Sequence, residues 1–184
     1  DTLTAITANV VDLTNNKSLA GGAVAADGAG LNTTATIVTN SVAPGASTTF
    51  PLYVNNTSGV ADNYNLSVTG APAGSTVTFK LDGGAGNCST TGATVTNTGS
   101  IAPAGNQLIC AVVSMPPNAL ATTTGTPLTF KVQSAVSGAA DTIIDAVTVD
   151  TVRNVTLSTN NSGQAAPGGS VVYTQTLTNS GNVT

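Results

Sequence analysis

The sequence predicts an all-β fold, an antiparallel β-sandwich with Greek-key connections, on three observations. Short segments of alternating apolar and polar residues recur about every ten residues, between turns rich in Gly, Pro and Asn. No stretch of useful length has the apolar period of a helix. A turn-and-strand signature occurs twice, at residues 42–59 and 165–181, and aligns Pro44 with Pro167 without a gap. The shift of 123 residues (167 minus 44) is close to the size of one sandwich domain, which indicates one complete repeat and the start of a second.

The duplication divides the chain into three regions. Residues 1–40 are expected to hold an N-terminal strand and a Gly-rich insertion loop, with a short strand near residues 35–39, packed on or leading into the first sandwich. Residues 41–150 are expected to form that sandwich. Residues 151–184 are expected to supply the first strands of an incomplete second repeat, which further chain or a neighbouring subunit would complete.

A shorter duplication agrees with this division. The run Val155-Thr156-Leu157, followed by two Asn residues, resembles Val11-Asp12-Leu13, which is also followed by two Asn residues. Both runs read as a strand that ends in a turn.

Alternation within residues 41–150 predicts which side chains face the core. A last strand is expected at residues 143–149. Pro51 has no amide hydrogen for a strand ladder, so we expect its strand to lie at an edge or to be bulged there. The predicted inward rows are Phe50, Leu52 and Val54; Tyr64, Leu66 and Val68; Val77, Phe79 and Leu81; Leu108, Cys110 and Val112; and Leu128, Phe130 and Val132.

Composition limits both the core and the partners. Hydrophobic residues make up 40% of the 184 residues, but with three Phe, three Tyr and no Trp the core must be thin and built from small side chains. Charged residues make up only 7%, against roughly 25% in ordinary globular domains. The net charge of -4 leaves no basic patch for a phosphate backbone, which excludes nucleic acid as a partner.

The same composition indicates where the protein acts. No unbroken apolar run reaches the roughly 18 residues of a transmembrane helix, so we expect no membrane insertion. Low charge with abundant Thr, Ser, Asn and Gly is typical of secreted and surface-exposed bacterial proteins, so we expect an extracellular or cell-surface location. The chain begins at Asp1 without Met or a leader, which fits a processed or excerpted chain.

The motifs resemble a known family. Residues 166–184, Ala-Pro-Gly-Gly-Ser-Val-Val-Tyr-Thr-Gln-Thr-Leu-Thr-Asn-Ser-Gly-Asn-Val-Thr, resemble the opening of the tandem immunoglobulin-like (Ig-like) conserved repeats of unknown function in large bacterial surface proteins. Residues 42–149 are similar to the related Ig-like modules appended to secreted glycosidases. The resemblance implies an Ig-like sandwich and carries no catalytic residues across. Gln175 departs from the pattern, because it occupies a usually apolar inward position.

Cys88 and Cys110 are the two cysteines of the chain. An even count in an apparently exported chain predicts a disulfide between them, with a pair of buried thiols as the alternative. The crosslink would stabilise the fold by roughly 3 kcal/mol in the chain-entropy model. Two Cys in a chain without His do not complete a tetrahedral zinc site.

The Asp residues offer the remaining acid-base chemistry. We expect them to be solvated surface charges and expect no cofactor. The sequence lacks a calcium loop of alternating Asp and Asn closed by Glu. If calcium binds, its candidate ligands are Asp141, Asp145 and Asp150, with Asp12 and Asp27 as further candidates.

Catalysis is not expected. Nucleophilic triads need a His that the chain lacks, and a glycosidase carboxylate pair would need two Asp residues converging in a cleft, which a sandwich does not supply.

Two functions fit these observations. The first is a structural module of a surface-layer, sheath or filament protein, which associates with copies of itself or with further repeats. Its candidate contact residues are Val155, Leu157, Val171, Tyr173 and Leu177. The alternative is an adhesin or carbohydrate-binding module, in which Tyr53, the aromatic that alternation places on an outer face, would contact a glycan. Glycosylation sequons occur at Asn32, Asn56, Asn65, Asn154 and Asn182.

Overall fold

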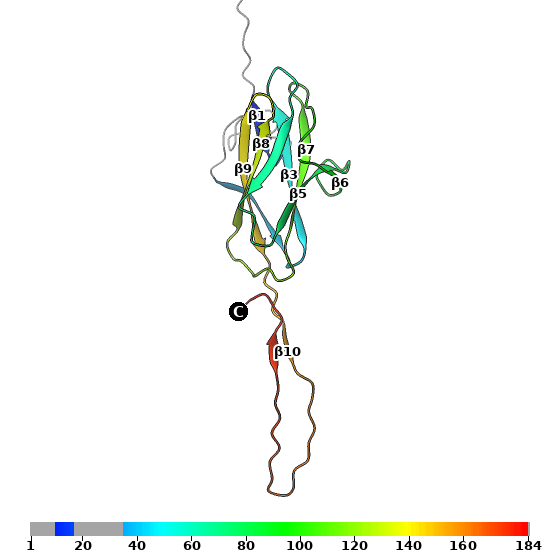
Figure 1. Ribbon diagram of the computed structural model, residues 1–184, viewed down its shortest axis with the longest axis vertical. Coiled ribbons are helices and arrows are strands. Elements are labelled where there is room, and N and C mark those ends of the chain that lie inside the picture. Colours follow the sequence, from blue (N-terminus) through cyan, green and yellow to red (C-terminus); the bar gives the residue numbers. More distant parts are fainter. Residues whose placement is uncertain (1–9, 17–34, 184) are drawn as a thin grey trace, which may run out of the picture.

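The computed structural model describes residues 10–16 and 35–183, and every regular element in this part is a strand (Figure 1). The strands are β1 (Val11–Thr14), β2 (Thr36–Val42), β3 (Ser47–Asn56), β4 (Tyr64–Thr69), β5 (Thr76–Asp82), β6 (Thr91–Thr94), β7 (Asn106–Ser114), β8 (Thr126–Ser134), β9 (Ala140–Val149), β10 (Val155–Leu157) and β11 (Leu177–Asn179). Within these residues no helix is long and apolar enough to cross a membrane.

Strands β1 to β9 form two sheets packed face to face. One sheet has the order β1-β3-β7-β5-β6 and the other β2-β9-β8-β4. Among β1 to β9 the chain changes sheet between β1 and β2, β2 and β3, β3 and β4, β4 and β5, and β7 and β8. The crossings from β3 onward give the Greek-key arrangement of an Ig-like sandwich. The predicted fold class is confirmed, with one difference: β2 pairs with β9 in parallel, whereas the other pairings are antiparallel.

The first 40 residues contribute to this sandwich where the structure describes them. Strand β1 is an edge of the first sheet and β2 is an edge of the second, so the first two strands of the chain lie in different sheets. The strand expected near residues 35–39 is present as β2. The Gly-rich insertion, with Asp27 and Asn32, lies outside the described residues, apart from its end at residues 35–40.

The core lies between the sheets and is centred on three phenylalanines. The rings of Phe50 and Phe130 lie 5.7 Å apart, and those of Phe79 and Phe130 lie 6.2 Å apart, distances at which tilted aromatic pairs attract. Aliphatic side chains of both sheets complete the interior. Four of the five predicted inward rows are confirmed, because their members are buried or packed against the core.

The predicted phase of β7 is wrong by one residue. We expected Leu108, Cys110 and Val112 to face the core, but the fully buried core residues of this strand include Ile109 and Ala111. Strand β7 is apolar on both faces, so alternation alone does not fix its phase. The phase is set by pairing with β3, which places Ala111 opposite Phe50.

Pro51 shows why a proline is tolerated inside a sheet. Strand β3 lies between β1 and β7, but β1 ends at Thr14, which is paired with Tyr53. Pro51 therefore lies beyond the end of β1, where its missing amide hydrogen interrupts no pairing between these two strands. The predicted edge position or bulge is therefore wrong, because β3 is an inner strand with a regular register to β7; Pro51 is tolerated because β1 does not reach it.

Candidate functional site

The most exposed apolar surface lies on the segment that follows the sandwich. Residues 151–183, here called the C-terminal ribbon, leave the base of the sandwich and form a long hairpin that points away from it (Figure 1). Near the base, β10 pairs with β11 in antiparallel fashion, with Val155 opposite Asn179 and Leu157 opposite Leu177.

This pairing reproduces the first strand pair of the sandwich. In the sandwich, β1 pairs with β3 so that Val11 lies opposite Asn56 and Leu13 lies opposite Val54. The shift of 123 residues moves Asn56 to Asn179 and Val54 to Leu177, so both the residues and the register recur. The geometry therefore agrees with the duplication seen in the sequence.

The turn before β3 also recurs in the ribbon. The Ala46 amide donates to the Ala43 carbonyl at 3.0 Å, and the Gly169 amide donates to the Ala166 carbonyl at 2.8 Å. Gly45 and Gly168 have φ angles of 76° and 81°, which only glycine adopts without strain.

The turn after the strand recurs as well. The Asn56 side chain accepts from the Ser58 amide at 3.0 Å and donates to the Val60 carbonyl at 2.7 Å. The Asn179 side chain accepts from the Gly181 amide at 3.0 Å and donates to the Val183 carbonyl at 2.7 Å. Asn56 and Asn179 thus make the same pair of side-chain hydrogen bonds, to the amide two residues later and to the carbonyl four residues later, where each strand ends.

The two copies differ in burial. Val11, Leu13 and Val54 are fully buried in the sandwich, whereas Val155, Leu157 and Leu177 are 61%, 63% and 69% exposed. The other predicted contact residues, Val171 and Tyr173, are also exposed, and the Phe50 ring that corresponds to Tyr173 is fully buried. The ribbon thus presents to solvent the face that the sandwich covers with its second sheet.

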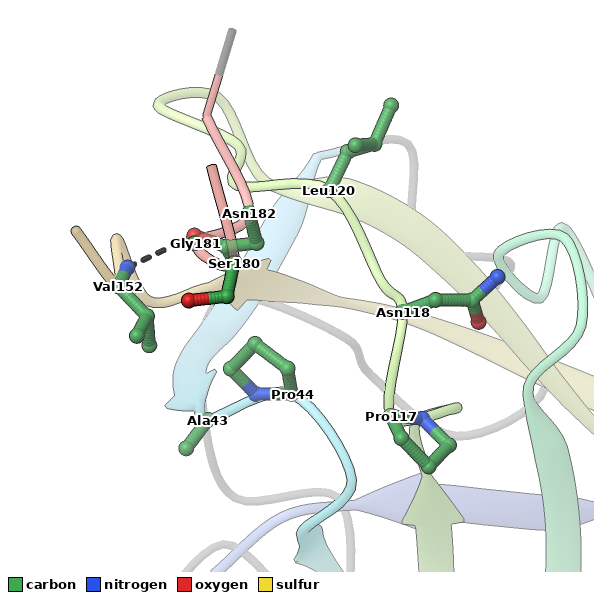
Figure 2. A pocket seen from close by; sticks show the side chains of 9 residues that line it. All are labelled: Ala43, Pro44, Pro117, Asn118, Leu120, Val152, Ser180, Gly181 and Asn182. Carbon is green, nitrogen blue, oxygen red and sulfur yellow. Dashed lines mark hydrogen bonds between the residues drawn. The ribbon is translucent and has the colours of Figure 1, made fainter. Parts of the chain in front are cut away.

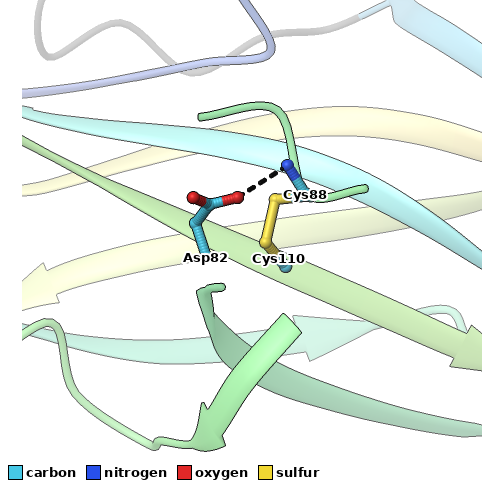
Figure 3. Close-up of side chains that lie close together, drawn as sticks. All are labelled: Asp82, Cys88 and Cys110. Carbon is cyan, nitrogen blue, oxygen red and sulfur yellow. Dashed lines mark hydrogen bonds between the residues drawn. A yellow bond between two sulfur atoms is a disulfide. The ribbon is translucent and has the colours of Figure 1, made fainter. Parts of the chain in front are cut away.

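The predicted disulfide joins Cys88 to Cys110 (Figure 3). It fastens residues 83–90, here called the disulfide loop, to the outer face of the first sheet. Tyr53 lies under this loop with Leu108, and its hydroxyl donates to the Gly86 carbonyl at 2.9 Å. Tyr53 is only 7% exposed, so the predicted aromatic platform for a glycan is wrong, because the loop covers the face on which alternation placed this ring.

The carboxylate of Asp82 binds main-chain amides of the disulfide loop. It accepts from the amides of Gly84 and Gly86, both at 2.8 Å, and of Cys88 at 2.9 Å. These bonds, that of Gly86 above all, lower the pKa of Asp82 below its ordinary value. Among the described residues, Asp82, Cys88 and Cys110 are the one group of three possible metal ligands, but both sulfurs are in the disulfide and offer no thiolate.

Asp141 and Asp145 occupy a different environment from the one predicted. Both are fully buried, as is Asp12, and Asp62 is only 8% exposed, so the expectation of solvated charges is wrong for these four residues and holds for the exposed Asp150. Alternation placed Asp141 and Asp145 on one face of β9 but did not show that this face is covered.

The buried side chains of Asp141 and Asp145 on β9 bind residues in or next to β1 and β2. Asp141 Oδ2 accepts from the Leu13 amide at 2.8 Å. Asp145 Oδ1 accepts from the Val38 amide at 3.1 Å, and its Oδ2 accepts from Asn15 Nδ2 at 2.9 Å. These contacts tie β1 and β2 to β9. The described part of the chain does not bring Asp141, Asp145 and Asp150 together in one group of ligands.

Two of the sequon residues are inaccessible to modification. Asn56 and Asn182 are buried, and their side-chain amides donate to main-chain carbonyls. Asn65 and Asn154 are exposed. The structural roles of Asn56 and Asn182 were not predicted, although the Asn-x-Ser and Ser-Gly-Asn turns were visible in the sequence.

No protein-family model matches this chain, and no curated protein sequence matches it. Similar solved structures include a FixG-related protein from Vibrio parahaemolyticus, with a TM-score of 0.39 and 16% identity over 56% of this chain and 78% of that chain. A PapD-like domain of human CEP192 has a TM-score of 0.39 and 12% identity over 81% of this chain and 92% of its own. The N-terminal domain of PorA has a TM-score of 0.38 and 12% identity over 74% of this chain and 96% of its own.

Proposed function

We propose that this chain is a non-catalytic structural module of an extracellular bacterial surface-layer, sheath or filament protein, built from stacked Ig-like sandwiches. One observation carries the proposal. The C-terminal ribbon repeats the residues, register and turns of the β1–β3 pair, while its apolar side chains are exposed.

The exposed apolar face of the ribbon is expected to be stabilised by burial against further strands. An isolated two-stranded hairpin is marginally stable in water, and sheets gain independent stability when further strands or a second layer cover their apolar face. In the first sandwich, β7 pairs with β3 and the second sheet covers the inner face. We infer that further strands of the same kind, from another copy or from further repeats, cover the ribbon in the assembled protein.

The remaining features support a location outside the cell and a role without catalysis. Disulfides persist in oxidising compartments, and the Cys88–Cys110 bond is built into the sheet surface. The chain has no His, and its buried carboxylates at Asp141 and Asp145 accept bonds from main-chain and side-chain amides of β1 and β2. These acids contribute to the architecture of the sandwich.

The proposal predicts that self-association depends on the ribbon. We expect Leu157→Asp combined with Leu177→Asp to shift sedimentation from oligomers to monomer, because two desolvated charges oppose burial of this face. Val136→Asp is the matched control, since Val136 is exposed on the sandwich and is not part of the ribbon. A doubly substituted chain that assembles as well as the control would contradict the proposal, as would saturable binding of the monomer to a glycan array.

A further inference from the structure

The junction between the sandwich and the ribbon is centred on one buried side chain. Asn182 is only 8% exposed, although most residues of the ribbon are exposed. Its main-chain amide donates to the Val152 carbonyl at 2.9 Å, and its carbonyl accepts from the Ala121 amide at 3.0 Å. The main chain of Asn182 therefore bonds to both the linker after β9 and the loop between β7 and β8.

The side chain of Asn182 bonds to the same two segments. Its Nδ2 donates to the Ala119 carbonyl at 3.1 Å and to the Asp150 carbonyl at 2.8 Å. Its Oδ1 accepts from the Val152 amide at 2.7 Å, the bond drawn in Figure 2. Both hydrogens of the Asn182 amide group are used. A rotation of the ribbon against the sandwich would break its bonds to Ala119, Ala121 and Asp150, whereas its two bonds to Val152 lie within the ribbon.

The linker itself is bonded on both sides. The Asp150 amide donates to the Val42 carbonyl at 2.9 Å, and the Asn154 carbonyl accepts from the amides of Ser180 at 2.9 Å and Gly181 at 3.1 Å. A Cβ on Gly181 would collide with the Val152 carbonyl oxygen and lie 2.9 Å from the Asn154 nitrogen. Residues 150–154 thus lack the freedom of an unpaired linker.

The sandwich side of the junction is stiff as well. A groove of about 580 Å³ lies beside Asn182, and two of its walls carry Pro44 and Pro117 (Figure 2). Proline fixes its own φ, so these walls resist deformation. The Gly45 amide donates to the Pro116 carbonyl at 3.1 Å and ties the two prolyl turns together.

We propose that Asn182 is the positioning residue that fixes the orientation of the C-terminal ribbon relative to the sandwich. The orientation follows from contacts within one chain. Its consequence for an array rests on the proposed function: where modules are stacked through this junction, the contacts of Asn182 set the orientation of one module relative to the next.

The test measures this orientation in the single chain. Spin labels are introduced as ketone-bearing amino acids at the exposed positions Ser67, on β4, and Thr156, on β10, which leaves the disulfide intact. Double electron–electron resonance then gives the distribution of distances between the two spin labels. We expect one narrow distribution for the otherwise unaltered chain, a broad one for Asn182→Ala, and a narrow one for Asn118→Ala, which alters the same groove without touching the bonds of Asn182.

Hydrogen exchange provides a second readout. The Val152 amide should exchange about tenfold faster or more in Asn182→Ala than in Asn118→Ala, because it loses its acceptor. A broad distribution in the unaltered chain, or an unchanged distribution in Asn182→Ala, would overturn the proposal. A narrow distribution in a chain that forms no assemblies would support the fixed junction and count against the proposed function, so the two are separable.

Discussion

At the scale of single residues, the buried side chains of Asp141 and Asp145 connect β1 and β2 to β9. Strand β1 lies in one sheet and β2 in the other, and each has a main-chain amide whose acceptor is a side chain of β9. Asp141 accepts from Leu13 of β1, and Asp145 accepts from Val38 of β2. A carboxylate accepts several such bonds, which explains why acidic side chains lie at these two positions.

Asp141→Ala is expected to lower the free energy of unfolding by about 1 to 3 kcal/mol, because the buried Leu13 amide loses its acceptor. Urea denaturation measures the change. Asp150→Ala, which removes an exposed carboxylate, should stay within about 0.5 kcal/mol of the unaltered protein. Equal effects of the two substitutions would show that the Asp141 carboxylate does not support β1.

At the scale of elements, the disulfide loop covers the outer face of the first sheet. It buries Tyr53 and Leu108 together with the disulfide, which gives this sheet a small second core. The chain has no Trp, so the emission of Tyr53 and the other tyrosines reports directly on such burial.

Replacing both cysteines tests this element. Cys88→Ala with Cys110→Ala is expected to lower the free energy of unfolding by roughly 3 kcal/mol, because the bond closes a separation of 22 residues. Quenching of tyrosine fluorescence by acrylamide should rise as Tyr53 becomes accessible. Reduction of the unaltered protein should reproduce both effects, and a change below about 1 kcal/mol would contradict this role of the loop.

The Asp82 carboxylate makes the loop sensitive to acid. Its pKa is lowered from 3.8, so its ionised form is favoured by folding, and that contribution is present above pH 3.8. The contribution is lost as the pH falls through the lowered pKa, when the proton displaces the bonds from Gly84, Gly86 and Cys88. The amide resonances of these residues should titrate together with a midpoint below 3.8.

Asp82→Asn supplies the comparison for this titration. The asparagine has no proton to gain in this range, so the amide resonances of the loop should lose their common midpoint. A midpoint at or above 3.8 in the unaltered protein would show that the loop amides do not stabilise the carboxylate.

The success of the sequence predictions varied between elements for physical reasons. Strands with one apolar face, such as β5 and β8, were predicted with the correct phase, because burial on one side produces a period of two. Strand β7 is covered on both faces, by the core and by the disulfide loop, and its apolar run carries no phase. The disulfide loop also buries Tyr53, which alternation predicted to be exposed.

The candidate site was predicted in part. The duplicated turn and strand located the ribbon, because Pro, Gly and Asn at fixed spacing specify local turns. The junction was not predicted, since the bonds of Asn182 join residues 30 or more positions apart, as the separation of 63 residues from Ala119 illustrates. Pairings of this kind depend on the assembled fold and leave no local pattern.

At the scale of the whole molecule, one sandwich and one projecting ribbon form a unit suited to stacking. The sandwich has its own core, while the ribbon exposes Val155, Leu157 and Leu177 on strands that copy β1 and β3. Charged residues make up only 7% of the chain. Few charged side chains therefore oppose the addition of further strands to the exposed strand edges.

In the proposed assembly, the ribbon is covered as β1 and β3 are covered in the sandwich. Cryo-electron microscopy of the native assembled material tests this proposal most directly. We predict a polymer with a constant axial repeat in which Leu157 and Leu177 are buried and the free edge of β11 is paired with an antiparallel strand. Assembled material in which the ribbon stays exposed to solvent, or in which its two strands are paired differently, would contradict the proposal.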